Sequence, residues 1–138
     1  MNKEKRVGQR TYQSISLAMA IVFAVVGLIF LFCAGQVLHL FNILAIQLGL
    51  PQSSEEVTGF YLILAVAYMY VVTLLAFLMH RHAENPLPPF LLINAKAASA
   101  LLSALFFVFH QSYLIYLVNA VVDGSIALAV AWLRKERR

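Results

Sequence analysis

Residues 89–138 read PFLLINAKAASALLSALFFVFHQSYLIYLVNAVVDGSIALAVAWLRKERR, which is two apolar runs that each contain one charged residue. Lys96 interrupts the first run, Asp123 interrupts the second, and the short polar link 110–112 joins them. A charged side chain near the middle of a bilayer costs about 2.5 to 3.5 kcal/mol on insertion scales. Such side chains therefore face a partner, a cavity or another protein rather than lipid. The stretch predicts a membrane hairpin with a polar interior.

The composition agrees with a membrane protein. The 138 residues are 62% hydrophobic and only 12% charged, whereas a soluble domain carries about 25% charged residues. This number of charged residues is too small to cover a surface exposed to water. We therefore expect the protein to lie in a lipid bilayer. The net charge is +4, but the basic residues gather mainly at the two ends of the chain. They are therefore interpreted as orienting the protein in the membrane and not as binding nucleic acid.

The apolar runs predict an all-α integral membrane protein with one four-helix domain over residues 1–138. A span needs about 20 mainly apolar residues. Four runs of about that length occur, at about 14–38, 57–79, 90–109 and 113–133. Residues 38–50 fit either a short interfacial segment or a continuation of the first helix. The sequence Ser53-Ser54-Glu55-Glu56 resembles a capping box, in which Ser53 accepts a hydrogen bond from the Glu56 amide.

The distribution of positive charge predicts the topology. Lysine and arginine are in excess at both termini and around Arg81, while the loop after the first span carries only Glu55 and Glu56. Under the positive-inside rule, four antiparallel spans with both termini in the cytoplasm satisfy every loop. The expected location is the cytoplasmic (inner) membrane of a bacterium or archaeon.

Lys96 and Asp123 are predicted to lie at similar depths in the membrane. Lys96 follows Pro89 by seven residues, about 10 Å along a helix that rises about 1.5 Å per residue. Asp123 precedes Arg134 by eleven residues, about 16 Å from the same side. The difference is about one helical turn, which a lysine side chain can span. We therefore expect a polar pair inside the membrane.

Polar and small residues flank this pair on both runs. Supporting polar side chains are expected from Asn94, Ser99, Ser103 and Asn119. Small residues allow helices to approach closely, and serine or asparagine can hydrogen-bond across the contact. Three interpretations stay open for the pair: an ion pair that fixes the register of the hairpin, a proton, ion or substrate site, and a contact to a partner subunit.

Other residues suggest cofactors only weakly. His39 and His110 lie near the outer ends of two spans and are candidate axial ligands of haem b, because haem takes ligands from opposite directions. Tyr61 and Tyr68 share one face of the second span and are candidate aromatics of a quinone pocket. No catalytic triad, zinc motif or phosphate-binding loop is present, so no catalytic or metal-binding residue is assigned. With Cys33 as the only cysteine, no disulfide forms within the chain.

Three classes of function follow from these features. The first is a small non-catalytic membrane subunit or accessory protein of a larger complex or oligomer. The second is a small oligomeric transporter with Asp123 and Lys96 in a polar pathway, and the third is a redox module that binds haem or quinone. In size and number of spans the chain resembles the DoxX-type small four-helix membrane proteins. That resemblance is one of layout, and it assigns no residue a role.

Overall fold

The computed structural model describes residues 3–56 and 59–136, and within them the chain forms four helices and no strand. The helices are α1 (Lys3–Gln47), α2 (Gly59–Arg81), α3 (Leu87–Phe109) and α4 (Leu114–Glu136). Each is long and apolar enough to cross a membrane. Large apolar side chains point outward, such as Phe32, Phe109 and Leu128 at 75%, 80% and 74% exposed. The predicted all-helical fold with four helices of membrane-spanning length is confirmed for the described residues.

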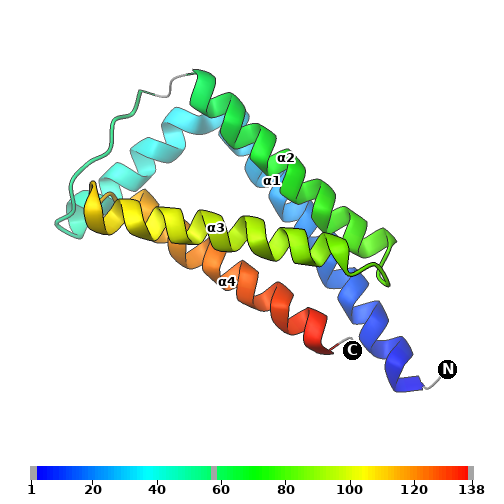
Figure 1. Cartoon of the computed structure of the whole chain (residues 1–138). Helices are drawn as coiled ribbons and strands as arrows, with labels where there is room; N and C mark the ends of the chain where they lie inside the picture. Colours follow the sequence, from blue (N-terminus) through cyan, green and yellow to red (C-terminus); the bar gives the residue numbers. More distant parts are fainter. Residues whose placement is uncertain (1–2, 57–58, 137–138) are drawn as a thin grey trace.

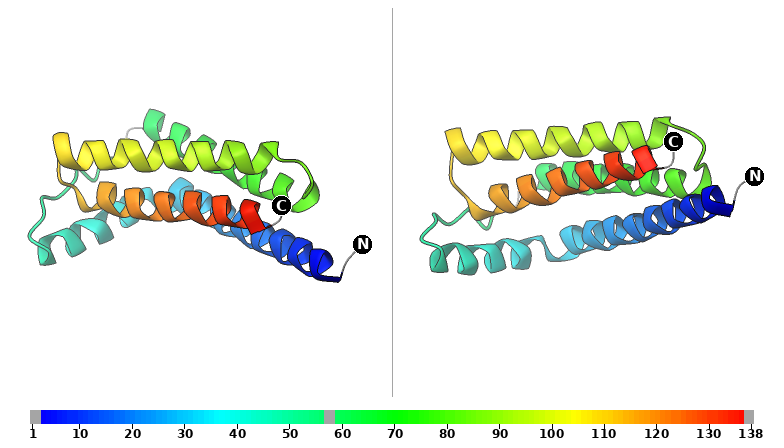
Figure 2. Two further views of the ribbon diagram at one scale, coloured as in Figure 1. Left: turned by 60° about the horizontal axis from the view of Figure 1, so that its bottom comes forward. Right: turned by 90° about the horizontal axis from the view of Figure 1, so that it is seen from below.

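The helices associate as two pairs. Helix α1 packs mainly along α2, and α3 packs mainly along α4 (Figure 1). The N- and C-termini lie at the same end of the molecule, which we call the terminal end (Figure 2). From there the two pairs diverge, so the far ends of α2 and α3 lie well apart in Figure 1. The contacts between the pairs are therefore concentrated near the terminal end.

The buried core lies in the half of the bundle nearest the terminal end. Its members come from all four helices and include Phe23 of α1, Met69 and Met79 of α2, Leu92 of α3 and Val130 of α4. Burial of apolar side chains here holds the two pairs against each other. The core thins out toward the far end, which leaves the diverging half of the bundle less tightly packed.

A glycine lies at the contact between the two helices of each pair. A Cβ placed on Gly27 of α1 would lie 3.1 Å from Cβ of Met69 on α2, closer than side chains normally pack. A Cβ on Gly124 of α4 would lie 3.7 Å from Cβ of Ala100 on α3, which is an ordinary contact. A side chain at Gly27 would therefore push Met69 aside by a few tenths of an ångström, whereas a Cβ at Gly124 would fit without such a shift.

Helix α1 consists of two helical parts joined at a kink. It has 45 residues, about 68 Å at about 1.5 Å per residue, and is thus far longer than a bilayer core of about 30 Å. Cys33 is non-helical, with φ −130° and ψ 25°. Beyond Cys33 the helix changes direction and runs across the opening between the two diverging pairs (Figure 1). Residues 38–47 are thus helical and follow the kink, up to Gln47. Whether this part lies at the membrane interface or continues the first span stays a prediction.

The end of α1 follows from its sequence. Gly49 has φ +68°, a left-handed conformation that glycine adopts at little cost. The Leu50 amide donates to the Ala45 carbonyl at 2.9 Å, and the Gly49 amide donates to the Ile46 carbonyl at 3.1 Å. These two bonds form a Schellman motif, which satisfies carbonyls at the end of the helix.

The predicted capping box at Ser53 is wrong. The amide and the hydroxyl of Ser53 both donate to Oδ1 of Asn42, at 2.9 and 3.1 Å. The Glu56 amide donates instead to the Ser54 hydroxyl, at 3.2 Å. Ser53 is drawn toward α1 because the kinked helix brings Asn42 beside the loop. The predicted start of the second span at 57 lies outside the described residues, and α2 is described from Gly59 onward.

Candidate functional site

Lys96 of α3 and Asp123 of α4 meet inside the bundle. Lys96 Nζ lies 2.8 Å from Asp123 Oδ1, and the two side chains are only 4% and 5% exposed. Asp123 is next in sequence to Gly124, where α3 and α4 approach each other. Burying the two charges as a hydrogen-bonded ion pair costs less free energy than burying either charge without its partner. The structure thus brings together the two charged residues that interrupt the apolar runs.

The ammonium group of Lys96 is also covered by the other helix pair. Its Nζ lies 4.9 Å from the centre of the Phe23 ring on α1 and 5.1 Å from the centre of the Tyr68 ring on α2. A cation within about 6 Å of a ring centre is attracted to the negative face of the ring. All four helices therefore contribute to the surroundings of this charge.

Further polar contacts join α3 to α4 and α2 to α3. The Asn119 side-chain amide donates to the hydroxyl oxygens of Ser99, at 3.1 Å, and Ser103, at 2.7 Å. The Tyr68 hydroxyl donates to the Ala95 carbonyl at 3.2 Å. Three of the four expected supporting residues, Ser99, Ser103 and Asn119, therefore lie together. Asn94 does not: it is exposed and donates to the Phe90 carbonyl of its own helix.

A cavity of about 380 Å³ adjoins the ion pair and is lined by residues of all four helices. Its polar wall is formed by the side chains of Tyr68, Lys96, Ser99, Asn119 and Asp123. The remaining wall is apolar and consists of Val22, Phe23, Val26, Phe30, Phe41, Ala65, Met69, Ile115, Val118, Val122 and Ile126. The cavity thus combines a small polar region with a much larger apolar one.

The kinked end of α1 contributes to this cavity and is fastened to the loop that follows it. Phe41 lines the cavity from beyond the kink, and its neighbour Asn42 donates to the Ser53 carbonyl at 2.8 Å. His39 Nδ1 lies 3.0 Å from Glu55 Oε1. Hydrogen bonds from His39 and from Asn42 lower the pKa of the Glu55 carboxyl below its usual value of 4.5. These contacts hold the segment of α1 after Cys33 in place.

The two candidate tyrosines line different hollows. Tyr68 lines the cavity beside Lys96, whereas Tyr61 is 68% exposed. Tyr61 borders a different, apolar hollow of about 200 Å³ near Ala34 and Leu62. The seven-residue spacing places both rings on one face of α2, but they lie two turns apart in depth. The two hollows share Phe30, Ala65 and Ile115, and of the two tyrosines only Tyr68 lies at the polar wall. A pocket formed by both tyrosines stays a prediction.

The two candidate haem ligands have separate partners. His39 pairs with Glu55 at the loop, while His110 lies edge-on against Phe106 of its own helix, with ring centres 5.6 Å apart. Both side chains are exposed. Among the described residues, no group of three or more histidine, cysteine, aspartate or glutamate side chains is arranged to hold a metal ion. The geometry gives no support to haem ligation by this pair.

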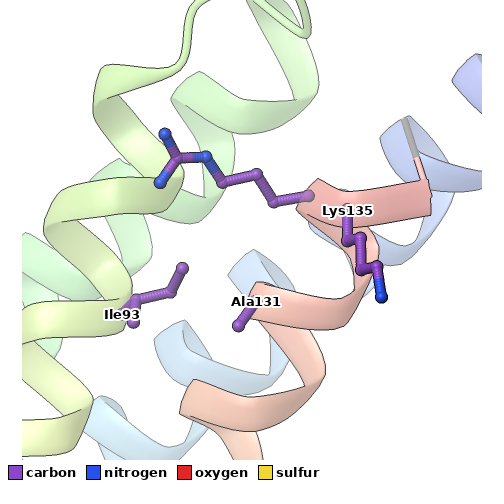
Figure 3. Close-up of a pocket in the computed structure, with 4 residues that line it drawn as sticks. Ile93, Ala131 and Lys135 are labelled. Atoms are coloured by element: carbon purple, nitrogen blue, oxygen red, sulfur yellow. The ribbon is translucent and has the colours of Figure 1, made fainter. Parts of the chain in front are cut away.

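Another hollow, of about 240 Å³, lies near the terminal end between α3 and α4. It is lined by Ile93, Ala131, Arg134 and Lys135, and Figure 3 shows Ile93 and Ala131 on its two sides with Lys135 turned outward. Arg134 lies over the Phe90 ring, with its guanidinium carbon 6.0 Å from the ring centre. This hollow brings together no pair of acid and base side chains.

Sequence reasoning missed Phe23, Phe41 and the contacts of Asn42. Asn42 is detectable as a polar residue in an apolar run, but its partner Ser53 depends on the direction of the helix after the kink. Comparison of the chain with known proteins found no matching family model, no matching curated protein and no matching solved structure.

Proposed function

We propose that this chain is a small, non-catalytic integral membrane protein that binds a small, mainly apolar molecule in the cavity between its helix pairs. The observation that supports this function is the cavity of about 380 Å³ beside Lys96 and Asp123, lined by all four helices. Binding sites for small molecules are concave, mostly apolar and about 300 to 1,000 Å³ in volume, with a few placed polar groups. The cavity fits this description in size and in composition.

The polar wall favours binding over catalysis. Lys96 and Asp123 are paired with each other at 2.8 Å, so each group is occupied in neutralising the other. A general acid or base must instead exchange a proton with its substrate. Asn119, Ser99 and Ser103 form a hydrogen-bonded set whose chemistry is recognition of polar atoms. The residues are therefore suited to holding and orienting a molecule.

We further infer that the four helices cross the bilayer as an antiparallel bundle with both termini in the cytoplasm of a bacterium or archaeon. The basic residues at both ends and at Arg81 support this orientation under the positive-inside rule. The loop with Glu55 and the kinked end of α1 then face the outside. Epitope tags at either terminus should be protected in intact spheroplasts and become accessible after permeabilisation, whereas accessibility in intact spheroplasts would refute this topology.

All four helices of one chain line the cavity, so a single copy provides both the polar and the apolar wall on which the binding function rests. An accessory role in a larger membrane complex is compatible with this function. Extraction with a polymer that keeps native lipid around the protein, followed by identification of co-purifying proteins, would reveal such a complex.

The test of the binding function is the identity of the small molecules that co-purify with the protein. Extracts of polymer-solubilised protein are analysed by mass spectrometry for the wild type, Val118→Trp and Val121→Trp. Val118 lines the cavity, whereas Val121 is 60% exposed on the outside of the same helix. A molecule enriched with the wild type and Val121→Trp but lost from Val118→Trp would support the function. Identical extracts from all three proteins would refute it.

A further inference from the structure

We infer that the molecule bound in this cavity is an uncharged amphiphile with a hydroxyl group, held with its hydroxyl against Asn119 and Asp123 and its apolar body against the wall formed by α1. This inference rests on the proposed function, because it assumes that the cavity binds a ligand. It goes further by naming the charge, the hydrogen-bonding character and the size of that ligand.

The charge of the ligand follows from the charge of the wall. Among the residues that line the cavity, Lys96 and Asp123 carry the formal charges, and these cancel. The side of the Lys96 ammonium that faces α1 and α2 is covered by the rings of Phe23 and Tyr68. An anionic or cationic ligand would therefore bring an uncompensated charge into a mainly apolar site, at a large desolvation cost. A neutral ligand avoids that cost.

The hydrogen-bonding character of the ligand follows from the acceptor atoms of the cavity wall. Lys96 donates to Oδ1 of Asp123, and Asn119 uses its Nδ2 for both of its bonds to serine. Asp123 Oδ2 and Asn119 Oδ1 receive no hydrogen bond from the part of the chain that the structure describes. Both residues line the cavity, and they lie four positions apart on the same face of α4. The wall thus presents these two acceptor atoms to the ligand. A hydroxyl group can donate a hydrogen bond to them, whereas an ether oxygen has no hydrogen to donate.

The size and shape follow from the remaining wall. A water-sized group takes about 30 Å³, so a volume of about 380 Å³ holds about a dozen such groups. Val22, Val26 and Phe30 supply the apolar surface on α1, and Phe41 adds to it from beyond the kink. A linear alcohol of about ten carbons, or an alcohol or phenol of similar volume, matches both the space and its apolar lining.

The experiment uses probes of matched size: 1-decanol, nonyl methyl ether, decanoate and decylammonium. Binding to the full chain in lipid nanodiscs is measured as the rise in unfolding temperature beyond that seen with Val118→Trp, which corrects for effects of the probes on the bilayer. We expect 1-decanol to stabilise the wild type and the other three probes to stabilise it less, with at least tenfold weaker binding. Preference for decanoate or decylammonium, or equal binding of the ether, would overturn the inference.

Variants of the two charged residues test whether the charge of the wall decides which probe binds. Lys96→Met leaves Asp123 unpaired, so decylammonium should become the preferred probe, and Asp123→Asn leaves Lys96 unpaired, so decanoate should become preferred. Asn119→Leu removes one acceptor without changing the charge and should weaken 1-decanol binding about tenfold, which provides a readout if the charge variants fail to fold. Unchanged probe preference in folded charge variants, or unchanged 1-decanol binding by Asn119→Leu, would contradict the inference.

The experiments distinguish a failure of the proposed function from a failure of this inference alone. If no probe stabilises the wild type more than Val118→Trp and the native extracts also match, the cavity binds no ligand and the proposed function fails with this inference. If the native extracts contain a cavity-dependent molecule that carries a charge or lacks a hydrogen-bond donor, the proposed function stands and this inference fails alone.

Discussion

Lys96 Nζ on α3 lies 2.8 Å from Asp123 Oδ1 on α4, and the rings of Phe23 and Tyr68 from the other helix pair cover the same ammonium. This arrangement joins the two helix pairs at one buried charge. It also forms the polar wall of the cavity between them. A change at either charged residue should therefore affect both stability and binding.

The ion pair predicts how single and double substitutions change the stability of the protein. Asp123→Asn alone should lower stability by about 3 to 5 kcal/mol, because it leaves the buried Lys96 uncompensated. Adding Lys96→Met should restore much of that loss, since removal of both charges can be near neutral. The measurement is reversible unfolding of each variant in the same detergent. Full stability of Asp123→Asn on its own would show that the pair does not hold the bundle together.

Packing of α1 against α2 predicts a position-specific effect of glycine replacement. Gly27→Val should destabilise the protein by about 1 to 3 kcal/mol, because its Cβ would press on Met69 and force repacking. Gly35→Val is the matched control, since a Cβ at Gly35 meets nothing within 4 Å. Unfolding of the two variants in one detergent gives the comparison. Equal losses of stability would be inconsistent with the close contact at Gly27.

The hydrogen bonds of Asn119 predict a similar contrast between two asparagines. Asn119→Leu should cost about 1 kcal/mol, because side-chain hydrogen bonds between membrane helices contribute about 0.6 kcal/mol each on average. Asn94→Leu should be nearly neutral, since Asn94 is exposed and bonds only within α3. Unfolding measurements on both variants test the difference. A larger loss from Asn94→Leu would reverse the assignment of the two residues.

The contact between His39 and Glu55 predicts acid sensitivity at the loop. The pKa of Glu55 is lowered by its hydrogen bonds to His39 and Asn42, so the contact is fully formed above the ordinary value of about 4.5. It is lost as the pH falls through the lowered pKa and the carboxylate gains a proton. The protection of the segment 42–56 against hydrogen exchange, taken relative to the intrinsic exchange rate at each pH, should therefore fall on acidification below about pH 4.5. Glu55→Gln should remove this pH dependence, and an unchanged acid response in that variant would refute the link.

The helices and the ion pair follow from local features of the sequence. Hydropathy suffices to place four helices, because a helix that crosses a bilayer needs about 20 mainly apolar residues. The register of Lys96 and Asp123 follows from the rise of a helix and from a link too short to allow another arrangement. Ser99, Ser103 and Asn119 lie on the same stripes and come together with them.

The cavity is not predictable in this way, because it depends on the relative placement of the two helix pairs. The kink at Cys33 occurs without proline, so nothing in the apolar sequence indicates that α1 changes direction there. That turn brings Phe41 to the cavity and Asn42 to Ser53. The spacing of Tyr61 and Tyr68 likewise indicates a shared face of α2 but not which hollow each ring lines.

The most direct test of the proposed ligand site is an experimental structure of the wild-type protein crystallised in a lipid phase after extraction with its native lipids. We predict elongated density in the cavity lined by Phe30, Val118 and Ile126, with its polar end within hydrogen-bond distance of Asn119 or Asp123. A cavity closed by packing of the two helix pairs against each other, with density only on the outer faces of the helices, would contradict it.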